Sequence, residues 1–242
     1  MKSSPPVWGV MAALPQELGD LLHRLDHPST EVWAGRSFHR GHVAGQPIVA
    51  VTSRIGKVAA ALTATLLINR FKVDHLVFVG VAGGLGHGVH RGDVVVANRL
   101  VQHDLSAWPL FPVGEIPLLG LTELPTDPTL TQRLEQAARH ALVAKQQLHV
   151  GLIASGDQFI QGQAPSQAIR ARYPETLAVE MEGAAVAQVC TECGVPFGVI
   201  RTISDTADDS AAHNFNAFIE DTAAPLASRV LAELFPTSQS AG

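Results

Sequence analysis

The sequence is short of charge, cysteine and long apolar runs, and each shortage excludes a class of protein. Only 16% of the 242 residues are charged and the net charge is −5, so no basic character indicates nucleic-acid binding. No apolar run approaches the ~20 residues of a membrane helix. The N-terminus shows no signal-peptide pattern and leads directly into a strand-like segment. We therefore expect a cytoplasmic protein with neither nucleic acid nor a membrane as its partner.

The two cysteines and eleven histidines do not form a pattern typical of a metal site. Cys190 and Cys193 have C-x-x-C spacing, but they lie late in an apolar helical segment with no second ligand pair. We interpret them as helix-packing residues rather than as a redox or metal pair. The histidines include no H-E-x-x-H spacing, and His103 beside Asp104 is the one pair that merits inspection. We expect no metal and no cofactor.

Apolar residues make up 46% of the chain, which is enough for a large core. Segments with strand and helix patterns alternate along it, and no linker or repeat divides them. This alternation predicts one α/β domain over residues 1–242, with a sheet covered on both faces. The core is expected over 7–234, a long loop at 104–127 and a disordered tail from 236. Strands are predicted at 7–14, 37–43, 47–53, 75–82, 92–101, 148–155, 178–182 and 196–204, and helices at 15–25, 57–70, 128–144, 165–173, from 183 and up to 234.

Charged residues in apolar surroundings mark the candidate site. Glu180 and Glu182 lie in the stretch AVEMEGAA, where a strand pattern changes to a helix pattern. A buried carboxylate is costly without a partner, so these glutamates are either solvated or bound by something. In a strand register the two side chains share one face. Arg201 lies inside another apolar strand and needs a carboxylate partner if it is buried.

Four polar or glycine-rich segments follow predicted strands: 14–17, 80–88, 180–182 and 201–205. Ligands in α/β folds bind beyond the carboxyl ends of strands, so this coincidence predicts a ligand site there. The glycine run 80–88 lacks the G-x-G-x-x-G order of a dinucleotide loop and predicts a tight turn that allows close approach of a ribose or an anion. Taken alone, Glu17 is typical of a solvated helix residue, and Asp205 of a turn or a helix N-cap.

Five segments also carry a family resemblance: SRIGKVAAALTATLLI (53–68), GVAGGL (80–85), SGDQFI (155–160), VEMEGAAVAQVC (179–190) and RTISDTAD (201–208). In this order and spacing they resemble the purine nucleosidases that hydrolyse 5'-methylthioadenosine and S-adenosylhomocysteine, members of the nucleoside phosphorylase-like superfamily. The resemblance covers residues 7–233. It implies a three-layer α/β/α fold with a central mixed, twisted sheet, a small-molecule nucleoside substrate, and a part in methionine salvage.

The resemblance implies roles for individual residues. Asp205 matches the general acid at N7 of adenine, and Glu17 the residue that orients and deprotonates water. Glu182 matches the ribose-binding glutamate, whose two oxygens can accept hydrogen bonds from a cis-diol. For Glu180 we expect a structural partner inside the protein. The other predicted substrate-binding residues are Phe159 (stacking on the base), Ile160 (backbone contact to the base edge), Ile55, Met181 and Phe215 (ribose and alkylthio contacts), Arg201 (positioning of the carboxylates and water), Val81 and Ser204.

The chain departs from the family pattern in two places: Val81 stands where many relatives carry a serine or threonine, and LPQE (14–17) replaces the more acidic run usual before the catalytic glutamate. The first departure removes a hydroxyl donor for phosphate, and segment 14–17 holds no arginine to meet a phosphate dianion, so hydrolysis is favoured over phosphorolysis. The alternatives are a nucleosidase for another 5'-modified purine nucleoside (aminodeoxyfutalosine, 5'-deoxyadenosine or futalosine), a phosphorylase, and a catalytically silent nucleoside-binding module. Glu17, Glu182 and Asp205 together argue against the silent module.

The loop at 108–121 is apolar and has no obvious place in the core of a monomer. It carries Trp108, Leu110, Phe111 and Leu118. Large exposed apolar patches usually mark an interface. Relatives cover the 5' substituent with residues from a second subunit, so we predict a homodimer.

Overall fold

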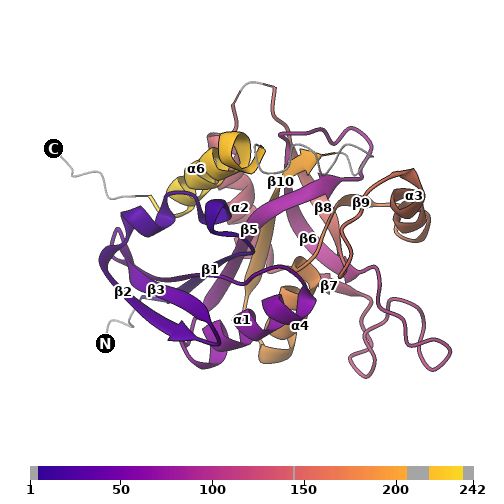
Figure 1. Ribbon diagram of the computed structural model, residues 1–242, viewed down its shortest axis with the longest axis horizontal. Helices are drawn as coiled ribbons and strands as arrows, with labels where there is room; N and C mark the ends of the chain where they lie inside the picture. Colours follow the sequence, from indigo (N-terminus) through magenta and orange to yellow (C-terminus); the bar gives the residue numbers. More distant parts are fainter. Residues whose placement is uncertain (1–4, 144, 206–217, 237–242) are drawn as a thin grey trace.

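One mixed sheet organises the protein, as seen in a computed structural model that describes residues 5–143, 145–205 and 218–236 (Figure 1). The strands are β1 (Trp8–Ala12), β2 (Asp26–Trp33), β3 (Arg36–Val43), β4 (Gln46–Thr52), β5 (His75–Gly84), β6 (Val94–Gln102), β7 (Glu123–Pro125), β8 (Leu148–Ser155), β9 (Thr176–Glu180) and β10 (Phe197–Asp205). The α-helices are α1 (Lys57–Asn69), α2 (Pro128–Ala141), α3 (Gln163–Arg172), α4 (Gly183–Cys193) and α6 (Ala224–Leu234).

The strands join in the order β2-β3-β4-β1-β5, and β5 continues into a second set, β10-β6-β8-β9. β9 then pairs back onto β5, so five strands close on themselves. β1 and β10 run parallel to β5, and β4 runs parallel to β1. In contrast, β9 is antiparallel to β5, and β6 is antiparallel to β10. The predicted mixed sheet is confirmed.

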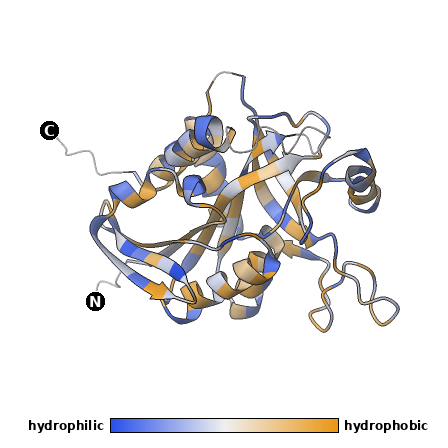
Figure 2. Cartoon of the chain, viewed as in Figure 1, coloured by the Kyte–Doolittle hydropathy of each residue, from blue (hydrophilic) through white to orange (hydrophobic). Residues whose placement is uncertain are grey.

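Helices cover both faces of the sheet, and this confirms the three-layer prediction. α2 and α6 pack together on one face through residues such as Leu134 and Leu231. α1 and α4 pack on the other through small side chains such as Ala64 and Ala184. Helix α6 shows apolar and polar residues side by side in Figure 2, as expected for a helix with one buried face. The core is therefore split into two apolar layers by the sheet.

The predicted helix over 15–25 is wrong. The segment forms two short 3-10 helices, Pro15–Leu18 and Leu21–Arg24, separated at Gly19. Gly19 has a φ of 56°, and a Cβ there would lie 2.3 Å from the Ser228 hydroxyl of α6. The close approach of α6 therefore decides the local backbone, and a helical sequence pattern cannot reveal it.

Other boundaries also differ from the predictions. Strand β2 was not predicted, because nearly all of its residues are exposed and it has no apolar alternation. The predicted loop 104–127 contains the short strand β7. The glycine run does not begin with a turn, since β5 continues to Gly84. Near the C-terminus of the chain, the π-helix Ile219–Ala223 precedes α6.

Candidate active site

A gap along one edge of β5 forms the base of the site. β10 pairs along the other edge from Leu76 to Gly83. On the edge with the gap, β1 pairs with His75 to Phe78 of β5, and β9 pairs only with Gly83 and Gly84. Between these two partners, Val81 donates its backbone N–H to the carboxylate of Glu17 at 3.0 Å. The split between β1 and β9 thus brings a side chain where a neighbouring strand would otherwise lie.

A cavity of about 330 Å³ opens at this split, within the range of small-molecule sites. It takes residues from the ends of β1, β5, β9 and β10, where the sequence analysis placed the ligand site. Its lining is Ala13, Leu14, Glu17, Ile55, Val81, Ala82, Gly83, Gln158, Phe159, Ile160, Val179, Glu180, Met181, Glu182, Ser204 and Asp205. Every predicted site residue in the described ranges lines the cavity except Arg201. Phe215 lies outside the described residues.

Glu17 is buried at the cavity wall and held by backbone donors. One carboxylate oxygen accepts N–H groups from Ala13 at 2.9 Å and Leu14 at 2.7 Å, and the other accepts from Val81. Burial raises the pKa of the Glu17 carboxyl, against the opposing effects of these donors and of Arg201. A Cβ at Gly80 would lie 3.0 Å from a Glu17 oxygen. The close approach predicted for the glycine run therefore occurs at Gly80, with a side chain of the protein.

Glu180, at the cavity wall, forms a buried ion pair with Arg201, which lies behind the wall. Arg201 donates to the Glu180 carboxylate at 2.8 Å, and only 1% of Arg201 is exposed. The same carboxylate accepts N–H groups of Glu182 and Gly183 at the start of α4, and the Ser155 hydroxyl. Arg201 also donates to two backbone carbonyl groups and lies over the Phe78 ring. The predicted internal partner of Glu180 is thus Arg201, and the arginine has its expected carboxylate.

Glu182 is not in the strand, so its predicted shared face with Glu180 in a strand register is wrong. β9 ends at Glu180, and Glu182 is the N-cap residue of α4. One of its oxygens accepts the Gly56 N–H at the start of α1, at 2.8 Å. Burial, with Glu180 nearby, raises the pKa of Glu182 to about 8. A buried carboxyl group with a single hydrogen-bond donor among the described residues is suited to accept further hydrogen bonds from a ligand.

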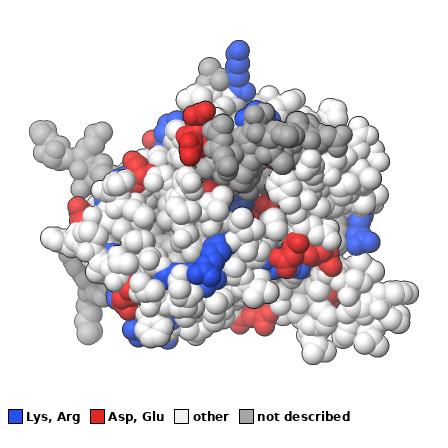
Figure 3. Space-filling view, viewed as in Figure 1, with Lys and Arg blue, Asp and Glu red and all other residues white. Residues whose placement is uncertain are grey.

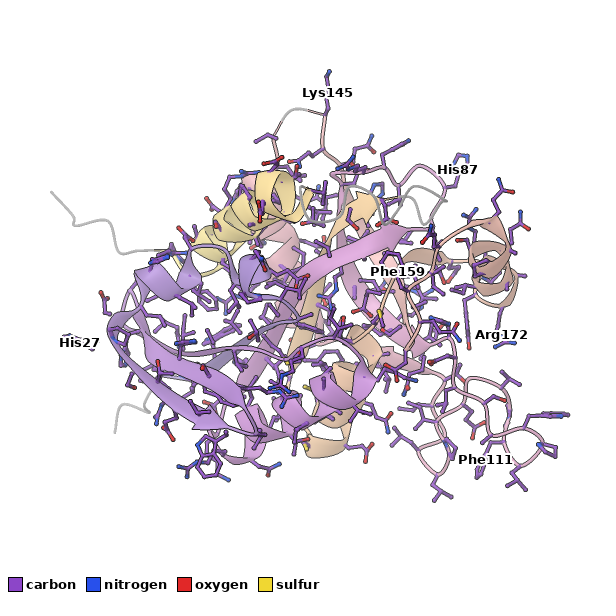
Figure 4. All side chains as sticks on the ribbon, in the orientation of Figure 1. His27, His87, Phe111, Lys145, Phe159 and Arg172 are labelled. Carbon is purple, nitrogen blue, oxygen red and sulfur yellow. The ribbon has the colours of Figure 1, made fainter. Side chains whose placement is uncertain are left out.

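The remaining predicted residues lie around the same cavity. Asp205 accepts a hydrogen bond from the Ser204 hydroxyl at 2.6 Å, so both belong to one polar group at the end of β10. Phe159, labelled in Figure 4, is 49% exposed, and Ile55 is 54% exposed, which places these two apolar side chains at the rim. Met181 and Ile160 contribute apolar wall between the carboxylates and the rim.

Several lining residues were not predicted individually, although Leu14, Ala82 and Gly83 lie within the predicted segments 14–17 and 80–88. They are Ala13, Leu14, Ala82, Gly83, Gln158 and Val179. Most are small or apolar and stand next to predicted residues in the chain. The sequence marks them only by their position, either beside a candidate residue or within a segment that follows a strand, because their side chains carry no distinctive chemistry.

The residues considered for a metal site are His103, Asp104 and the two cysteines. Asp104 pairs with Lys57 at 2.6 Å, and the His103 ring lies against Gly156. Both thiols are free; Cys190 is buried, in agreement with helix packing, whereas Cys193 is exposed and the packing interpretation is wrong for it. Within the described part of the chain, no three His, Cys, Asp or Glu side chains are grouped to hold a metal ion, and no helix is long and apolar enough to cross a bilayer. Figure 3 shows acidic and basic side chains scattered over the face drawn there.

A family model described as the phosphorylase superfamily matches residues 8–236. The chain belongs to this superfamily. A 5'-methylthioadenosine/S-adenosylhomocysteine nucleosidase of Colwellia psychrerythraea is 36% identical over 222 residues, which cover 89% of this chain and 90% of that protein. The chain also resembles two solved structures.

The first is a 5'-methylthioadenosine/S-adenosylhomocysteine nucleosidase from Neisseria meningitidis in complex with methylthio-immucillin-A. Its TM-score is 0.89 at 33% identity, covering 95% of this chain and 98% of that one. The second is a futalosine hydrolase of Helicobacter pylori, with a TM-score of 0.86 at 34% identity and coverage of 95% and 97%. Superfamily members with this fold therefore include hydrolases named for different nucleosides.

Proposed function

We propose that this protein hydrolyses the N-glycosidic bond of 5'-methylthioadenosine, S-adenosylhomocysteine or both, releasing adenine and the thioribose. The observation that carries the proposal is the placement of Glu17, Glu182 and Asp205 around one largely apolar cavity. The names of the relatives at 36% and 33% identity support the same substrate class.

The proposed roles divide the reaction among the three carboxylates. Cleavage passes through an oxocarbenium-like ribosyl species, whose positive charge is stabilised by nearby carboxylates. Asp205 protonates or hydrogen-bonds N7 so that the base leaves as a neutral group. Glu17 takes a proton from the attacking water, and its raised pKa makes it a stronger base than an ordinary carboxylate. Glu182 holds the ribose diol.

The cavity is better suited to hold water than phosphate as the nucleophile. The described lining residues include no arginine, lysine or histidine. A phosphate dianion would lie among carboxylates without a cation, because Arg201 is behind the wall and bound to Glu180. Val81 supplies no hydroxyl donor. We therefore place hydrolysis ahead of phosphorolysis.

The test is incubation with a panel of nucleosides, with and without phosphate, followed by detection of the released base. We expect adenine from 5'-methylthioadenosine and S-adenosylhomocysteine, at a rate independent of phosphate. Strict dependence on phosphate would identify a phosphorylase. Absence of base release from every nucleoside would leave only a binding module.

A nucleosidase for another 5'-modified purine nucleoside is the second candidate, because a futalosine hydrolase has the same fold at a TM-score of 0.86. Aminodeoxyfutalosine and 5'-deoxyadenosine carry adenine and fit the Asp205 assignment. Futalosine carries a 6-oxopurine and fits it poorly. The same panel separates these substrates.

We also propose a homodimer, formed through the loop that follows β6. Trp108, Leu110 and Leu118 on this loop are 71%, 84% and 93% exposed. The loop projects from the body of the molecule (Figure 1), and Figure 4 labels Phe111 on it. Exposed apolar side chains gathered on one loop favour burial against a partner. A single domain spanning the chain, a cytoplasmic location and a part in methionine salvage complete the proposal.

A further inference from the structure

Three segments that are distant in sequence meet at the carboxylate of Asp104, just beyond the end of β6. One oxygen accepts from the Lys57 ammonium at 2.6 Å, and the other accepts the backbone N–H of Asp157 at 2.8 Å. Only 18% of the Lys57 and Asp104 side chains is exposed. A Cβ at Gly156 would lie 3.0 Å from the Asp104 carboxyl carbon, so the 156–157 backbone passes directly against this group.

Asp157 closes a ring of contacts by returning to α1. Its carboxylate accepts the backbone N–H of Lys57 at 2.7 Å, the first residue of the helix. Lys57 is therefore held by its side chain to Asp104 and by its backbone to Asp157, while Asp104 holds the backbone of Asp157. The start of α1 and the loop after β8 cannot separate without breaking this ring.

The charges within the ring support a fixed geometry. A lysine in the first helical turn is unfavourable, because the helix N-terminus already carries partial positive charge. Asp104 compensates for it. Burial alone would raise the pKa of Asp104, but the hydrogen bonds from Lys57 and Asp157 and the Lys57 charge lower it below its usual value, so the carboxylate is charged.

The two segments held by the ring carry different parts of the candidate site. Gly56, next to Lys57, donates to Glu182. The residues after Asp157 are Gln158, Phe159 and Ile160, which line the cavity. A Cβ at Gly56 would lie 3.1 Å from the Asp157 carboxylate, so the two segments are also in direct contact. Lys57, Asp104 and Asp157 themselves do not line the cavity.

We propose that Lys57, Asp104 and Asp157 act as a positioning clamp that fixes the ribose-binding Glu182 relative to the base-binding loop 158–160. This inference rests on the proposed function for the identity of the substrate. The three residues act through their neighbours and do not touch the reacting atoms. A nucleoside spans both halves of the cavity, so the distance between them must match the length of the ligand.

The test compares Lys57→Met and Asp104→Asn, which remove one charge each, with Lys57→Arg, which keeps it. We expect kcat/KM for 5'-methylthioadenosine to fall about 10- to 100-fold in the first two, as for small displacements of positioning groups. Lys57→Arg should retain most of the activity. The variant that combines Lys57→Met with Asp104→Asn should lose no more kcat/KM than either single variant, because the two residues act as one unit. Glu31→Gln, which removes an exposed ion pair with Arg40, is the matched control and should behave as wild type.

Amide hydrogen exchange of the ligand-free proteins supplies a readout that does not depend on catalysis. We expect faster exchange at Gly56 and at residues 156–160 in Lys57→Met and Asp104→Asn, with the strands unchanged. Unchanged exchange at these amides, or unchanged kcat/KM in the folded variants, would overturn the clamp. If the wild-type protein releases adenine from no nucleoside, the proposed function fails, while hydrogen exchange still tests the clamp.

Discussion

The Arg201 guanidinium lies 2.8 Å from the Glu180 carboxylate, with both side chains almost completely buried. Removing one member of such a pair leaves the other as an uncompensated buried charge. We predict that Arg201→Met lowers the free energy of unfolding by about 3–5 kcal/mol, measured by urea denaturation. Glu31→Gln breaks exposed ion pairs and should change stability little. Equal effects of the two variants would show that the buried pair contributes no special stability.

Glu17→Gln should abolish turnover while leaving binding of a substrate analogue largely intact. An amide cannot take a proton from water, so kcat should fall ~10²-fold or more. The backbone donors at Ala13, Leu14 and Val81 surround both oxygens, and the amide NH₂ must face one of them. Some loss of stability should therefore accompany the loss of turnover. Steady-state kinetics and calorimetric binding separate the effects, and a kcat near wild type would remove Glu17 from the mechanism.

The raised pKa of Glu182 predicts a pH dependence of stability. Its pKa is about 8 in the folded protein, against an ordinary value of 4.5, so the folded state binds more protons between these pH values. Its contribution to stability is complete below pH 4.5 and is lost as the pH rises through about 8. The slope for one proton is at most ~1.4 kcal/mol per pH unit. Glu182→Gln should flatten the curve measured by denaturation from pH 5.5 to 8, and an unchanged slope would contradict the assignment.

Asp205 predicts selectivity for adenine over hypoxanthine nucleosides. Once Asp205 has given its proton to N7 it is ionised and offers only acceptors, which suit the N7–H and the N6 amino group and are repelled by a 6-oxo group. A site that leaves polar groups unpaired can reject the wrong base strongly, so we expect at least a ~100-fold preference in kcat/KM for 5'-methylthioadenosine over 5'-methylthioinosine. Asp205→Asn should lose most of the adenosine-type activity. Equal values for the two nucleosides would raise the futalosine alternative.

The projecting apolar loop predicts the oligomeric state. Light scattering at micromolar concentration should give the mass of a dimer. Leu110→Asp places a charge on the 84% exposed side chain of the proposed interface and should shift the protein toward monomer. Val143→Asp changes another exposed apolar residue, 55% exposed and outside the loop, and is the control. A fully active monomer would exclude the dimer.

Local pattern was informative wherever an element is buried. The alternation of apolar strands and helices predicted the layers, and the positions of 14–17, 80–88, 180–182 and 201–205 after strands predicted where the cavity lies. The strand β2 was not predicted, because a strand whose side chains are nearly all exposed leaves no apolar pattern in the sequence. The interruption of the predicted helix at Gly19 was also missed, because it is imposed by Ser228 of α6, a residue over 200 positions away in the chain.

The sequence by itself determined which chemistry is available: three carboxylates at strand ends, a glycine where backbone must come close, and an arginine that needs a partner. Only the tertiary structure decided which groups meet. Arg201 pairs with Glu180 rather than Glu17 or Glu182, and Val81 bonds to Glu17 because β1 and β9 separate along β5. Hydrogen bonds and ion pairs act over about 3 Å, whereas these partners lie 21 and 64 residues apart in the chain, so their pairing depends on strand order and register.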